Sequence, residues 1–359
     1  MNKKIIFSAG GTGGHIFPAI NLMKYFSGKG YKVLLGTDAR GDNLLNKYYK
    51  FKSHIITTDT PMKKNFFKKI SSYTVIFFSI IRSFFILIKE RPNLVFGFGG
   101  YVSFPLSFAS RFFNIPLIIY ENNLVLGRAN KALLPFAKKL LLGTTMPNNL
   151  NKKYENKVSR VGNILREEII NYSVKKKDND KNFFSILVLG GSQGADIFGK
   201  IIPSTIKMLK DEGKKIKINQ QCVASQKKSL IEFYNKNYIS NYVFDFSSNI
   251  LELISSSDLA ISRCGASTTA ELLHTFTPFI AVPYPHSMDN HQYLNAQYYE
   301  SKGYCWLLEQ DNFSSLNLFN LIISIINDKK KLENIYKNMK KNDSTNVYDK
   351  VETEVKKYI

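Results

Sequence analysis

Two glycine-rich segments of this sequence have the composition of phosphate-binding turns. Gly10–Gly14 reads GGTGG and Gly190–Gly194 reads GGSQG, so both have the form G-G-[ST]-x-G. Each follows a short apolar run and precedes a segment with helical periodicity. A glycine turn in that position lets the backbone approach a ligand closely and points free N–H groups at an anion. Both segments therefore predict phosphate binding, the alternative being glycines that merely permit tight turns.

Neither glycine segment matches the established nucleotide-binding motifs. The dinucleotide fingerprint would need glycine at position 16, which is Ile16, and neither segment ends in G-K-[ST]. Asp38 follows the second expected strand, where an acid that binds the ribose of NAD would lie. An NAD-dependent oxidoreductase therefore stays open as an alternative.

The residues that most often hold metal ions are scattered. The three cysteines are far apart and form no C-x-x-C pair: Cys222, Cys264 and Cys305. His286 and His291 have no cysteine nearby, which disfavours zinc. Asp178–Asp180 has the form D-x-D but lies in a polar segment, 171–181, that we interpret as part of the interdomain connection. The sequence predicts no disulfide framework, no metal site and no cofactor.

Short apolar runs alternate with helical segments along the chain, and the alternation restarts near residue 183. The expected strands of the first set are Ile5–Ala9, Lys32–Leu35, Leu94–Gly97, Leu117–Tyr120 and Lys139–Leu142. Those of the second set are Phe184–Leu189, Lys215–Gln220, Asp258–Ser262, Phe279–Val282 and Cys305–Leu307. This pattern is typical of α/β proteins with parallel sheets. We expect two doubly wound domains that face a cleft, with ligands at the carboxyl ends of the strands.

The composition is that of a folded but strongly basic protein. Of 359 residues 44% are hydrophobic, which excludes a wholly disordered chain, and the formal net charge is +22. Such a charge attracts anionic surfaces, although AT-rich coding would produce part of it. A basic protein that binds nucleic acid is a further alternative, but it leaves both glycine segments unexplained.

The most apolar segment, Tyr73–Ile88, is shorter than the roughly 20 residues that span a bilayer, and Arg82 interrupts it. We therefore expect no transmembrane helix. Phe77, Ile80, Ile81, Phe84 and Ile88 would share one helical face, whereas Phe78 and Phe85 point elsewhere. Basic residues flank the segment: Lys63, Lys64, Lys68, Lys69, Lys89 and Arg91. This pattern favours docking of residues 63–91 on an anionic membrane face, the alternative being a core helix.

Seven motifs, in order along the chain, resemble the MurG family of glycosyltransferases. They are GGTGGHIFPA at Gly10–Ala19, GFGGYVS at Gly97–Ser103, YENNLVLGRANK at Tyr120–Lys131, VGNILR at Val161–Arg166, GGSQGA at Gly190–Ala195, SRCGASTTAE at Ser262–Glu271 and NHQYLNA at Asn290–Ala296. The resemblance implies a GT-B-like fold. Residues 1–163 would form the domain that binds the acceptor and the membrane, and 164–343 the domain that binds UDP-GlcNAc. A final helix over 344–359 would pack on one of them, the N-terminal domain being a candidate.

The resemblance also implies the residues that bind the donor. Glu271 would accept both ribose hydroxyls, and Phe246 and Ser247 would contact uracil through their main chain. The second glycine turn would hold the diphosphate without a metal ion, through Ser192, Gln193 and Gly194. The GlcNAc ring is assigned to Gln292 and Asn295, with His291 beside them. Arg166 would reach the diphosphate or the uridine, or would form a hinge salt bridge.

On the acceptor side, Thr12, Gly13 and Gly14 would hold the acceptor diphosphate. The reaction implied is inverting, so a single displacement needs a base near the acceptor hydroxyl. His15 is the leading candidate because histidine titrates near neutrality, the alternative being that it only orients the turn. Glu121 is the second candidate for the base, and Asn123 would position the acceptor.

The activity implied is transfer of GlcNAc from UDP-GlcNAc to the C4 hydroxyl of undecaprenyl-diphospho-MurNAc-pentapeptide, the lipid I to lipid II step of peptidoglycan synthesis. This predicts a peripheral enzyme on the cytoplasmic face of the bacterial membrane that does not bind nucleic acid. A UDP-GlcNAc 2-epimerase, and another UDP-sugar transferase with a lipid acceptor, are the alternatives on the same fold. An epimerase would leave the apolar segment at 73–88 without a role.

Overall fold

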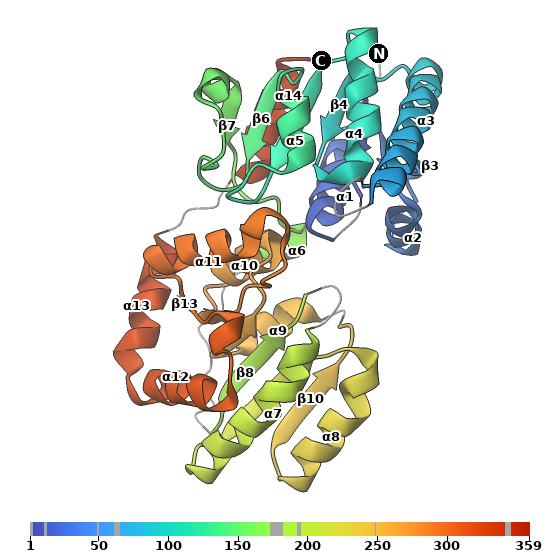
Figure 1. Ribbon diagram of the computed structural model, residues 1–359. Coiled ribbons are helices and arrows are strands. Elements are labelled where there is room, and N and C mark those ends of the chain that lie inside the picture. The colour runs from blue at the N-terminus through green and yellow to red at the C-terminus, as the bar shows by residue number, and fades with distance from the viewer. Residues whose placement is uncertain are drawn as a thin grey trace. The chain divides into compact units, whose positions relative to one another are not determined.

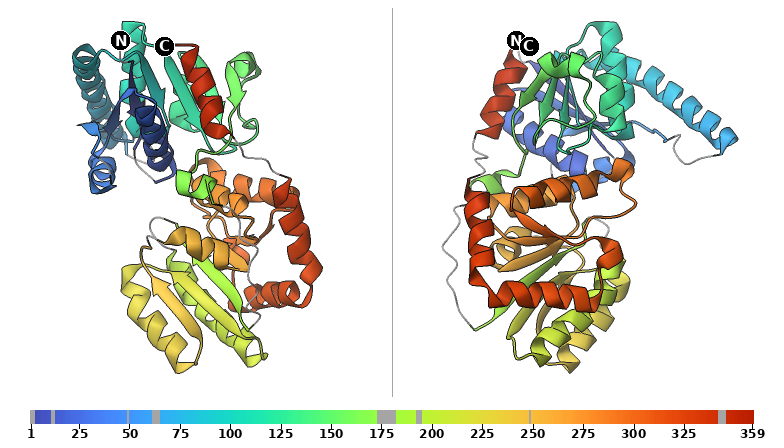
Figure 2. Two further views of the ribbon diagram at one scale, coloured as in Figure 1. Left: turned by 180° about the vertical axis from the view of Figure 1, so that it is seen from behind. Right: turned by 60° about the vertical axis from the view of Figure 1, so that its left-hand side comes forward.

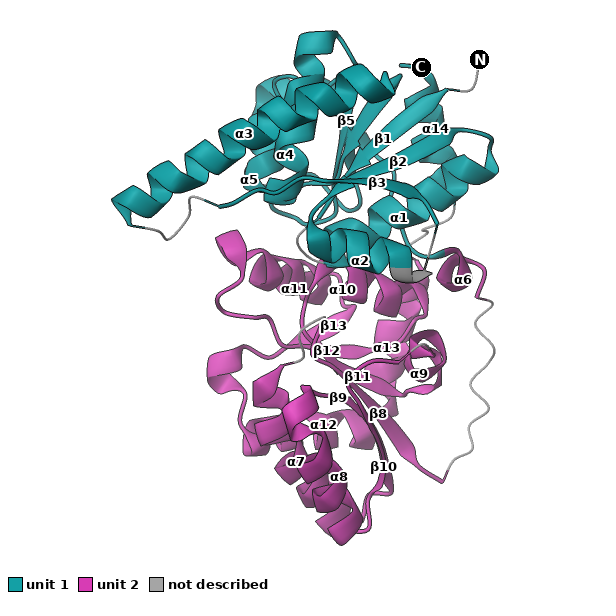
Figure 3. Cartoon of the chain, turned by 90° about the vertical axis from the view of Figure 1, so that its right-hand side faces the viewer, with its two compact units in different colours: residues 1–166, 344–359 teal, residues 167–343 magenta. Residues whose placement is uncertain are grey.

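The computed structural model describes residues 3–10, 13–48, 50–60, 65–172, 182–191, 195–247, 249–341 and 346–359. It divides into two compact units, which are coloured separately in Figure 3. Unit 1 comprises residues 1–166 together with 344–359, and unit 2 comprises residues 167–343. Each unit contains a parallel sheet covered by helices, as the alternating pattern predicted (Figure 1).

The sheet of unit 1 has the order β3-β2-β1-β4-β5-β6-β7, and every pairing is parallel. Its strands are β1 (Lys4–Ser8), β2 (Lys32–Thr37), β3 (Lys52–Ile55), β4 (Leu94–Gly97), β5 (Leu117–Glu121), β6 (Lys139–Leu142) and β7 (Val158–Arg160). Its helices are α1 (Gly13–Gly28), α2 (Ala39–Tyr48), α3 (Phe66–Glu90), α4 (Gly100–Ala109), α5 (Arg128–Leu133) and α14 (Val347–Lys356), with short turns η1 (Ser110–Phe113) and η2 (Lys152–Lys157).

Unit 2 repeats this order as β10-β9-β8-β11-β12-β13. Its strands are β8 (Phe184–Leu189), β9 (Ile216–Gln221), β10 (Ser240–Phe244), β11 (Leu259–Ser262), β12 (Phe279–Ala281) and β13 (Cys305–Leu307). Its helices are α6 (Glu167–Ile170), α7 (Asp196–Asp211), α8 (Lys227–Lys236), α9 (Ile250–Ser256), α10 (Ala266–His274), α11 (His291–Ser301), α12 (Ser315–Asn327) and α13 (Lys329–Lys340), with turns η3 (Ala224–Gln226), η4 (Met288–Asn290) and η5 (Gln310–Asn312). In both units the strand before the glycine turn lies inside the sheet, at the point where the order of the strands along the sheet reverses.

Apolar side chains from adjacent strands form the core of each unit. In unit 1 the fully buried Ile6, Val95 and Ile119 belong to one cluster, supplied by β1, β4 and β5. In unit 2 the equivalent cluster contains Ile186 and Ile261. Because these strands are covered on both faces, nearly every residue in them is apolar, and such runs can be recognised in sequence.

The C-terminal helix α14 packs on unit 1, beside α1 (Figure 2). The Tyr25 ring stacks on Tyr348 at 4.9 Å between centroids, and the Tyr25 hydroxyl donates to Glu352 at 2.6 Å. The Tyr348 hydroxyl donates to the carbonyl oxygen of Leu165 at 2.6 Å. Helix α14 thus holds Leu165 in place, close to the point where the chain passes from unit 1 to unit 2.

Helix α3 buries three of its serines and exposes most of its phenylalanines. Ser72, Ser79 and Ser83 face the unit, and their hydroxyls donate to backbone or carboxylate oxygens. Phe78 and Phe85 are 63% and 68% exposed. Packing of α3 on the core of unit 1 therefore explains its buried serine face but does not explain its exposed apolar face.

Helix α3 is also longer than the apolar segment seen in the sequence. It has 25 residues and is, among the described residues, the one helix long and apolar enough to cross a membrane by length and composition. The helix is thus longer than the apolar segment Tyr73–Ile88 on which the expectation of no transmembrane helix rested, and that expectation stays a prediction. The N-terminal half of α3 extends beyond the rest of unit 1 (Figures 2 and 3).

A buried carboxylate anchors the last turn of α3. The Glu90 oxygens lie 3.2 Å from Lys4 Nζ in β1, and 2.6 Å and 2.9 Å from Lys52 Nζ and His54 Nε2 in β3. Burial alone would raise the pKa of Glu90, but hydrogen bonds from Lys52, His54 and Lys4 outweigh it and lower the pKa from 4.5 to about 2.

We expect this cluster to stabilise unit 1 above pH 4.5 and to lose its effect as the pH falls toward 2, because the folded state holds the carboxylate at the lower pKa. At neutral pH, Glu90→Gln should lower the free energy of unfolding by about 2 kcal/mol. Urea unfolding at about pH 7 and pH 3 checks this. A difference between the two proteins that does not shrink in acid would contradict it.

Candidate active site

Three loops meet at the carboxyl edge of the unit 1 sheet, after the adjacent strands β1, β4 and β5. Gly13, Gly14 and His15 begin α1, and the carbonyl oxygen of Gly14 accepts a hydrogen bond from Asn122 Nδ2 at 3.1 Å. Gly100 begins α4 with φ +73°, and a Cβ there would lie 3.3 Å from His15 Nδ1. The His15 imidazole is thus held against a glycine that leaves room for it. Thr12 lies outside the described residues.

Glu121, the last residue of β5, accepts four hydrogen bonds and is 3% exposed. Its Oε1 accepts from the backbone N–H of Asn123 at 3.1 Å and from Asn123 Nδ2 at 3.0 Å. Its Oε2 accepts from the Gly127 N–H at 2.9 Å and from Asn130 Nδ2 at 3.0 Å. The loop after β5 is therefore folded around this carboxylate, which places the predicted acceptor residue Asn123 in direct contact with it.

In unit 2 the first group of predicted donor residues follows β8 and β10, which flank β9 in the sheet. Gly191, after β8, has φ +83°, while Ser192, Gln193 and Gly194 lie outside the described residues. Helix α7 begins directly after this turn, so its first N–H groups have the positive end of the helix dipole. Phe246 and Ser247 follow β10, and Phe246 is 63% exposed. The Ser247 hydroxyl accepts from the Asn249 N–H at 3.2 Å.

The remaining donor residues lie on α10 and α11. Glu271 lies on α10, which begins directly after the turn that follows β11. In α11, His291 Nδ1 donates to the carbonyl of Met288 at 2.8 Å, and Gln292 Oε1 accepts from the Tyr284 N–H at 3.0 Å. Asn295 is 1% exposed, and its Nδ2 donates to the carbonyl of Cys264 at 3.3 Å. Asn295 thus joins α11 to the turn that precedes α10.

Arg263 belongs to one of the quoted motifs, yet the sequence assigned it no role. Its guanidinium donates to the carbonyls of Val282 and Pro283, both at 3.1 Å, and to Gln310 Oε1 at 2.6 Å. Burial lowers the pKa of Arg263 to about 10, so the group stays charged at neutral pH. A buried cation of this kind orders the loop before α11 and raises the local positive potential. The sequence feature that could have identified Arg263 is its position directly after a buried strand.

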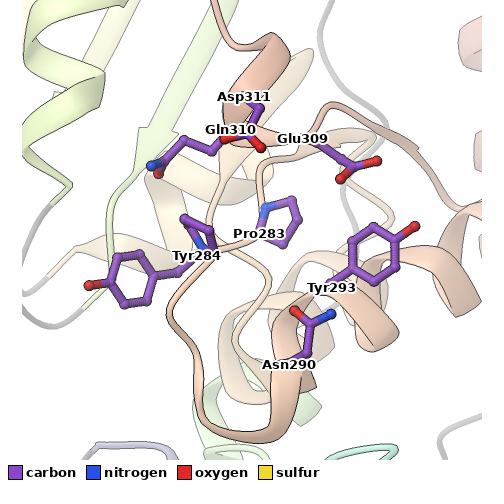
Figure 4. A pocket seen from close by; sticks show the side chains of 8 residues that line it. Pro283, Tyr284, Asn290, Tyr293, Glu309, Gln310 and Asp311 are labelled. Atoms are coloured by element: carbon purple, nitrogen blue, oxygen red, sulfur yellow. The ribbon is translucent and has the colours of Figure 1, made fainter.

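A cavity of about 160 Å³ adjoins this loop. Figure 4 shows Tyr293 and Glu309 on one side of Pro283, and Tyr284 and Gln310 on the other. Amides, hydroxyls and carboxylates dominate its lining, which suits the hydroxyls of a sugar. No group of three metal-binding side chains occurs among the residues that the structure describes.

Arg166 is the last residue of the first part of unit 1 and leads directly into α6 of unit 2. The other described candidates divide by unit. Gly13, Gly14, His15, Glu121 and Asn123 gather at the carboxyl edge of one sheet, and Phe246, Ser247, Glu271, His291, Gln292 and Asn295 follow strands of the other. This is the edge at which ligands bind in doubly wound folds.

Comparison with protein families identifies both halves of the chain. Residues 5–142 match the glycosyltransferase family 28 N-terminal domain, and residues 185–353 match the glycosyltransferase family 28 C-terminal domain. A protein of Pelagibacter ubique (strain HTCC1062) is 34% identical over 361 residues, covering 99% of this chain and 98% of the relative. A protein of Rickettsia felis is 35% identical, covering 94% and 95%. Both are named UDP-N-acetylglucosamine–N-acetylmuramyl-(pentapeptide) pyrophosphoryl-undecaprenol N-acetylglucosamine transferase.

Among solved structures, Acinetobacter baumannii MurG matches with a TM-score of 0.81 at 23% identity, covering 99% of each chain. The calicheamicin glycosyltransferase CalG4 matches with a TM-score of 0.71 at 10% identity, covering 99% of this chain and 98% of that one. These likenesses confirm the fold predicted from the sequence, a pair of doubly wound domains of the GT-B kind.

Proposed function

Since this chain belongs to the MurG family of N-acetylglucosamine transferases within glycosyltransferase family 28, we propose that it transfers GlcNAc from UDP-GlcNAc to the C4 hydroxyl of undecaprenyl-diphospho-MurNAc-pentapeptide. This is the lipid I to lipid II step of peptidoglycan synthesis. The observation that carries the proposal is that each unit presents its share of the expected residues at the carboxyl edge of its sheet. Transfer of labelled GlcNAc to the lipid acceptor tests it.

The donor is proposed to bind unit 2. The main chain of Phe246 and Ser247 would contact uracil, Glu271 the ribose and Ser192–Gly194 the diphosphate. Gln292 and Asn295, with His291 beside them, would bind GlcNAc, and Arg166 the diphosphate or uridine. The leaving UDP gains negative charge, which free N–H groups and the start of α7 stabilise without reorganisation.

The acceptor is proposed to bind unit 1, with its diphosphate on Thr12–Gly14 and its sugar near Asn123. His15 is proposed as the general base that takes the proton of the C4 hydroxyl. The four hydrogen bonds that Glu121 accepts favour His15 over Glu121, because a carboxylate with both oxygens occupied must break a bond before it accepts a proton. The single displacement inverts the anomeric carbon.

The alternatives on this fold are a UDP-GlcNAc 2-epimerase and a transferase with another lipid acceptor. An epimerase would convert UDP-GlcNAc alone into its C2 epimer, without any acceptor. The exposed phenylalanines of α3 favour a lipid acceptor, because an epimerase has no use for them.

We propose that unit 1 docks on an anionic membrane through α3, at the cytoplasmic face where the lipid acceptor would be presented. The exposed aromatic residues of α3 are Phe66, Phe67, Tyr73, Phe77, Phe78 and Phe85. Exposed cations flank them, at Lys68, Lys69, Arg82, Lys89 and Arg91. The serine face of α3 is held to unit 1 by side-chain hydrogen bonds. Because that face is therefore not free to contact lipid, a helix that lies in the membrane–water interface fits better than one that spans the bilayer. Such a peripheral enzyme would serve wall growth, and through it cell shape and division.

Replacing Phe78 and Phe85 by serine should weaken binding to anionic lipid vesicles about 100-fold, because each phenylalanine contributes roughly 1.5 kcal/mol when it leaves water. Phe84 is not suitable, since its ring packs on Phe112 and Phe113 at 5.3 Å and 5.6 Å. Vesicle co-sedimentation measures the effect, and Tyr238→Ser, an 89% exposed aromatic of unit 2, is the matched control. Unchanged binding of the double variant would contradict the docking proposal.

A further inference from the structure

One side chain joins the two segments that would bind the nucleotide. Gln221 is the last residue of β9, the strand between β8 and β10. Its Oε1 accepts a hydrogen bond from the Gly190 N–H at 3.1 Å, at the start of the turn after β8. Its Nε2 donates to the carbonyl of Asp245 at 3.3 Å, directly before Phe246.

Both bonds suit an amide at this position. The Gly190 N–H needs an acceptor and the Asp245 carbonyl needs a donor, and the glutamine amide offers one of each on the two atoms bonded to Cδ. Glutamate would direct a second acceptor at the carbonyl of Asp245, and an apolar side chain would offer neither. The reach of glutamine from the end of β9 therefore sets the spacing between the two segments.

The second link to Asp245 is weaker. Lys227 Nζ lies 3.2 Å from Asp245 Oδ1, and these side chains are 43% and 55% exposed. Exposed ion pairs contribute little because water and salt screen them. Lys227 comes from α8 and pairs with the Asp245 side chain, so this link involves the segment after β10 and does not set its spacing from the glycine turn.

We propose that Gln221 is a positioning residue that holds Gly190, at the start of the glycine turn, and Asp245, directly before the uracil-contacting segment, at the spacing that one nucleoside diphosphate requires. The inference rests on the proposed function, since it takes UDP as the ligand of these segments. When the two halves of a site already have the spacing that the ligand requires, less conformational entropy is lost on binding. Gln221 then determines affinity for UDP without touching the reacting atoms.

The test compares two variants of Gln221 in the full chain. Gln221→Met removes both hydrogen bonds at similar volume, and Gln221→Glu keeps the acceptor for Gly190 alone. We expect Gln221→Met to raise the Kd for UDP about tenfold, measured by calorimetry, because two hydrogen bonds are lost. Binding of uridine, which needs one segment only, should change less, and kcat at saturating donor should stay within about twofold. Gln221→Glu keeps the Gly190 bond but opposes a carboxylate oxygen to the Asp245 carbonyl, so its Kd for UDP should rise at least as much as that of Gln221→Met.

Gln220 supplies the matched control. It is the preceding residue of β9, fully buried, and its Oε1 accepts from the Tyr234 hydroxyl in the core. Gln220→Met should lower the Tm and leave the Kd for UDP unchanged. UDP binding by Gln221→Met as tight as in the unchanged protein, or an equal loss in both methionine variants, would overturn the inference. Failure of the unchanged protein to bind UDP would instead overturn the proposed function.

Discussion

Replacing His15 by glutamine should lower kcat by about 10²- to 10⁴-fold, the range that positioned acid–base groups contribute. The imidazole lies at the start of α1, beside Gly100, on the unit proposed to bind the acceptor. A base there removes the hydroxyl proton as the bond to the anomeric carbon forms. Glutamine keeps much of the volume and the hydrogen bonding but cannot take up the proton.

Steady-state kinetics at saturating donor and acceptor, together with the Kd for UDP, measure this. The Kd for UDP should not change, because His15 belongs to unit 1 and the donor is proposed to bind unit 2. A raised acceptor KM with an unchanged kcat would contradict the role of base and would support the alternative in which His15 orients the acceptor. Loss of kcat in Glu121→Gln, with full activity in the His15 variant, would make Glu121 the base.

Replacing Glu271 by alanine should raise the KM for UDP-GlcNAc about 100-fold, because two charge-assisted hydrogen bonds to the ribose are lost. The residue lies on α10, after a turn that Asn295 ties to α11 through the Cys264 carbonyl. This hydrogen bond thus links the turn before the Glu271 helix to the helix that is proposed to bind the sugar.

A deoxynucleotide separates this role from a general loss of structure. The unchanged protein should bind UDP more tightly than 2′-deoxy-UDP, and the alanine variant should bind both equally. Glu252→Ala, which removes an exposed acid from α9, is the control and should keep the preference. A preference for UDP that survives in the Glu271 variant would exclude the ribose contact.

The sheets could be predicted from sequence where their strands are covered on both faces. The runs at β1, β4 and β8 are nearly all apolar, so the pattern located them. The strands that sequence reasoning missed are β3, β7 and β10, all at sheet edges. Edge strands are partly exposed, so their residues, such as KSHI in β3, have no continuous apolar run to recognise.

Sequence could locate α3 but not its orientation. Its apolar residues define a face by helical periodicity, and the usual assumption is that this face is buried. The structure instead buries Ser79 and Ser83 and leaves Phe77 60% exposed. Which face packs inward depends on partners such as the carbonyl of Thr57, which come from another segment and leave no periodic signal in the helix.

The candidate site was predictable where backbone conformation demands a residue type. Gly100 and Gly191 have positive φ, a conformation that favours glycine, so glycine at these positions could be recognised in their motifs. Arg263 and Gln221 have no such backbone feature, because their partners, which are main-chain groups and the Gln310 side chain, lie in distant segments that only the fold brings close. Glu121 differs, because its four hydrogen-bond donors lie within nine residues of it in the motif Tyr120–Lys131, but the motif alone does not show that the loop turns back on the carboxylate.

The most direct test of the central claim is transfer of labelled GlcNAc from UDP-GlcNAc to a lipid-linked MurNAc-pentapeptide diphosphate, with and without EDTA. We expect label in the lipid product at the same rate in both arms, because the leaving diphosphate is proposed to be stabilised by N–H groups of the second glycine turn and α7. Label that disappears with EDTA would contradict that leaving-group proposal. No label in the lipid, from folded protein that binds UDP, would contradict the proposed transferase activity and favour the epimerase or another acceptor.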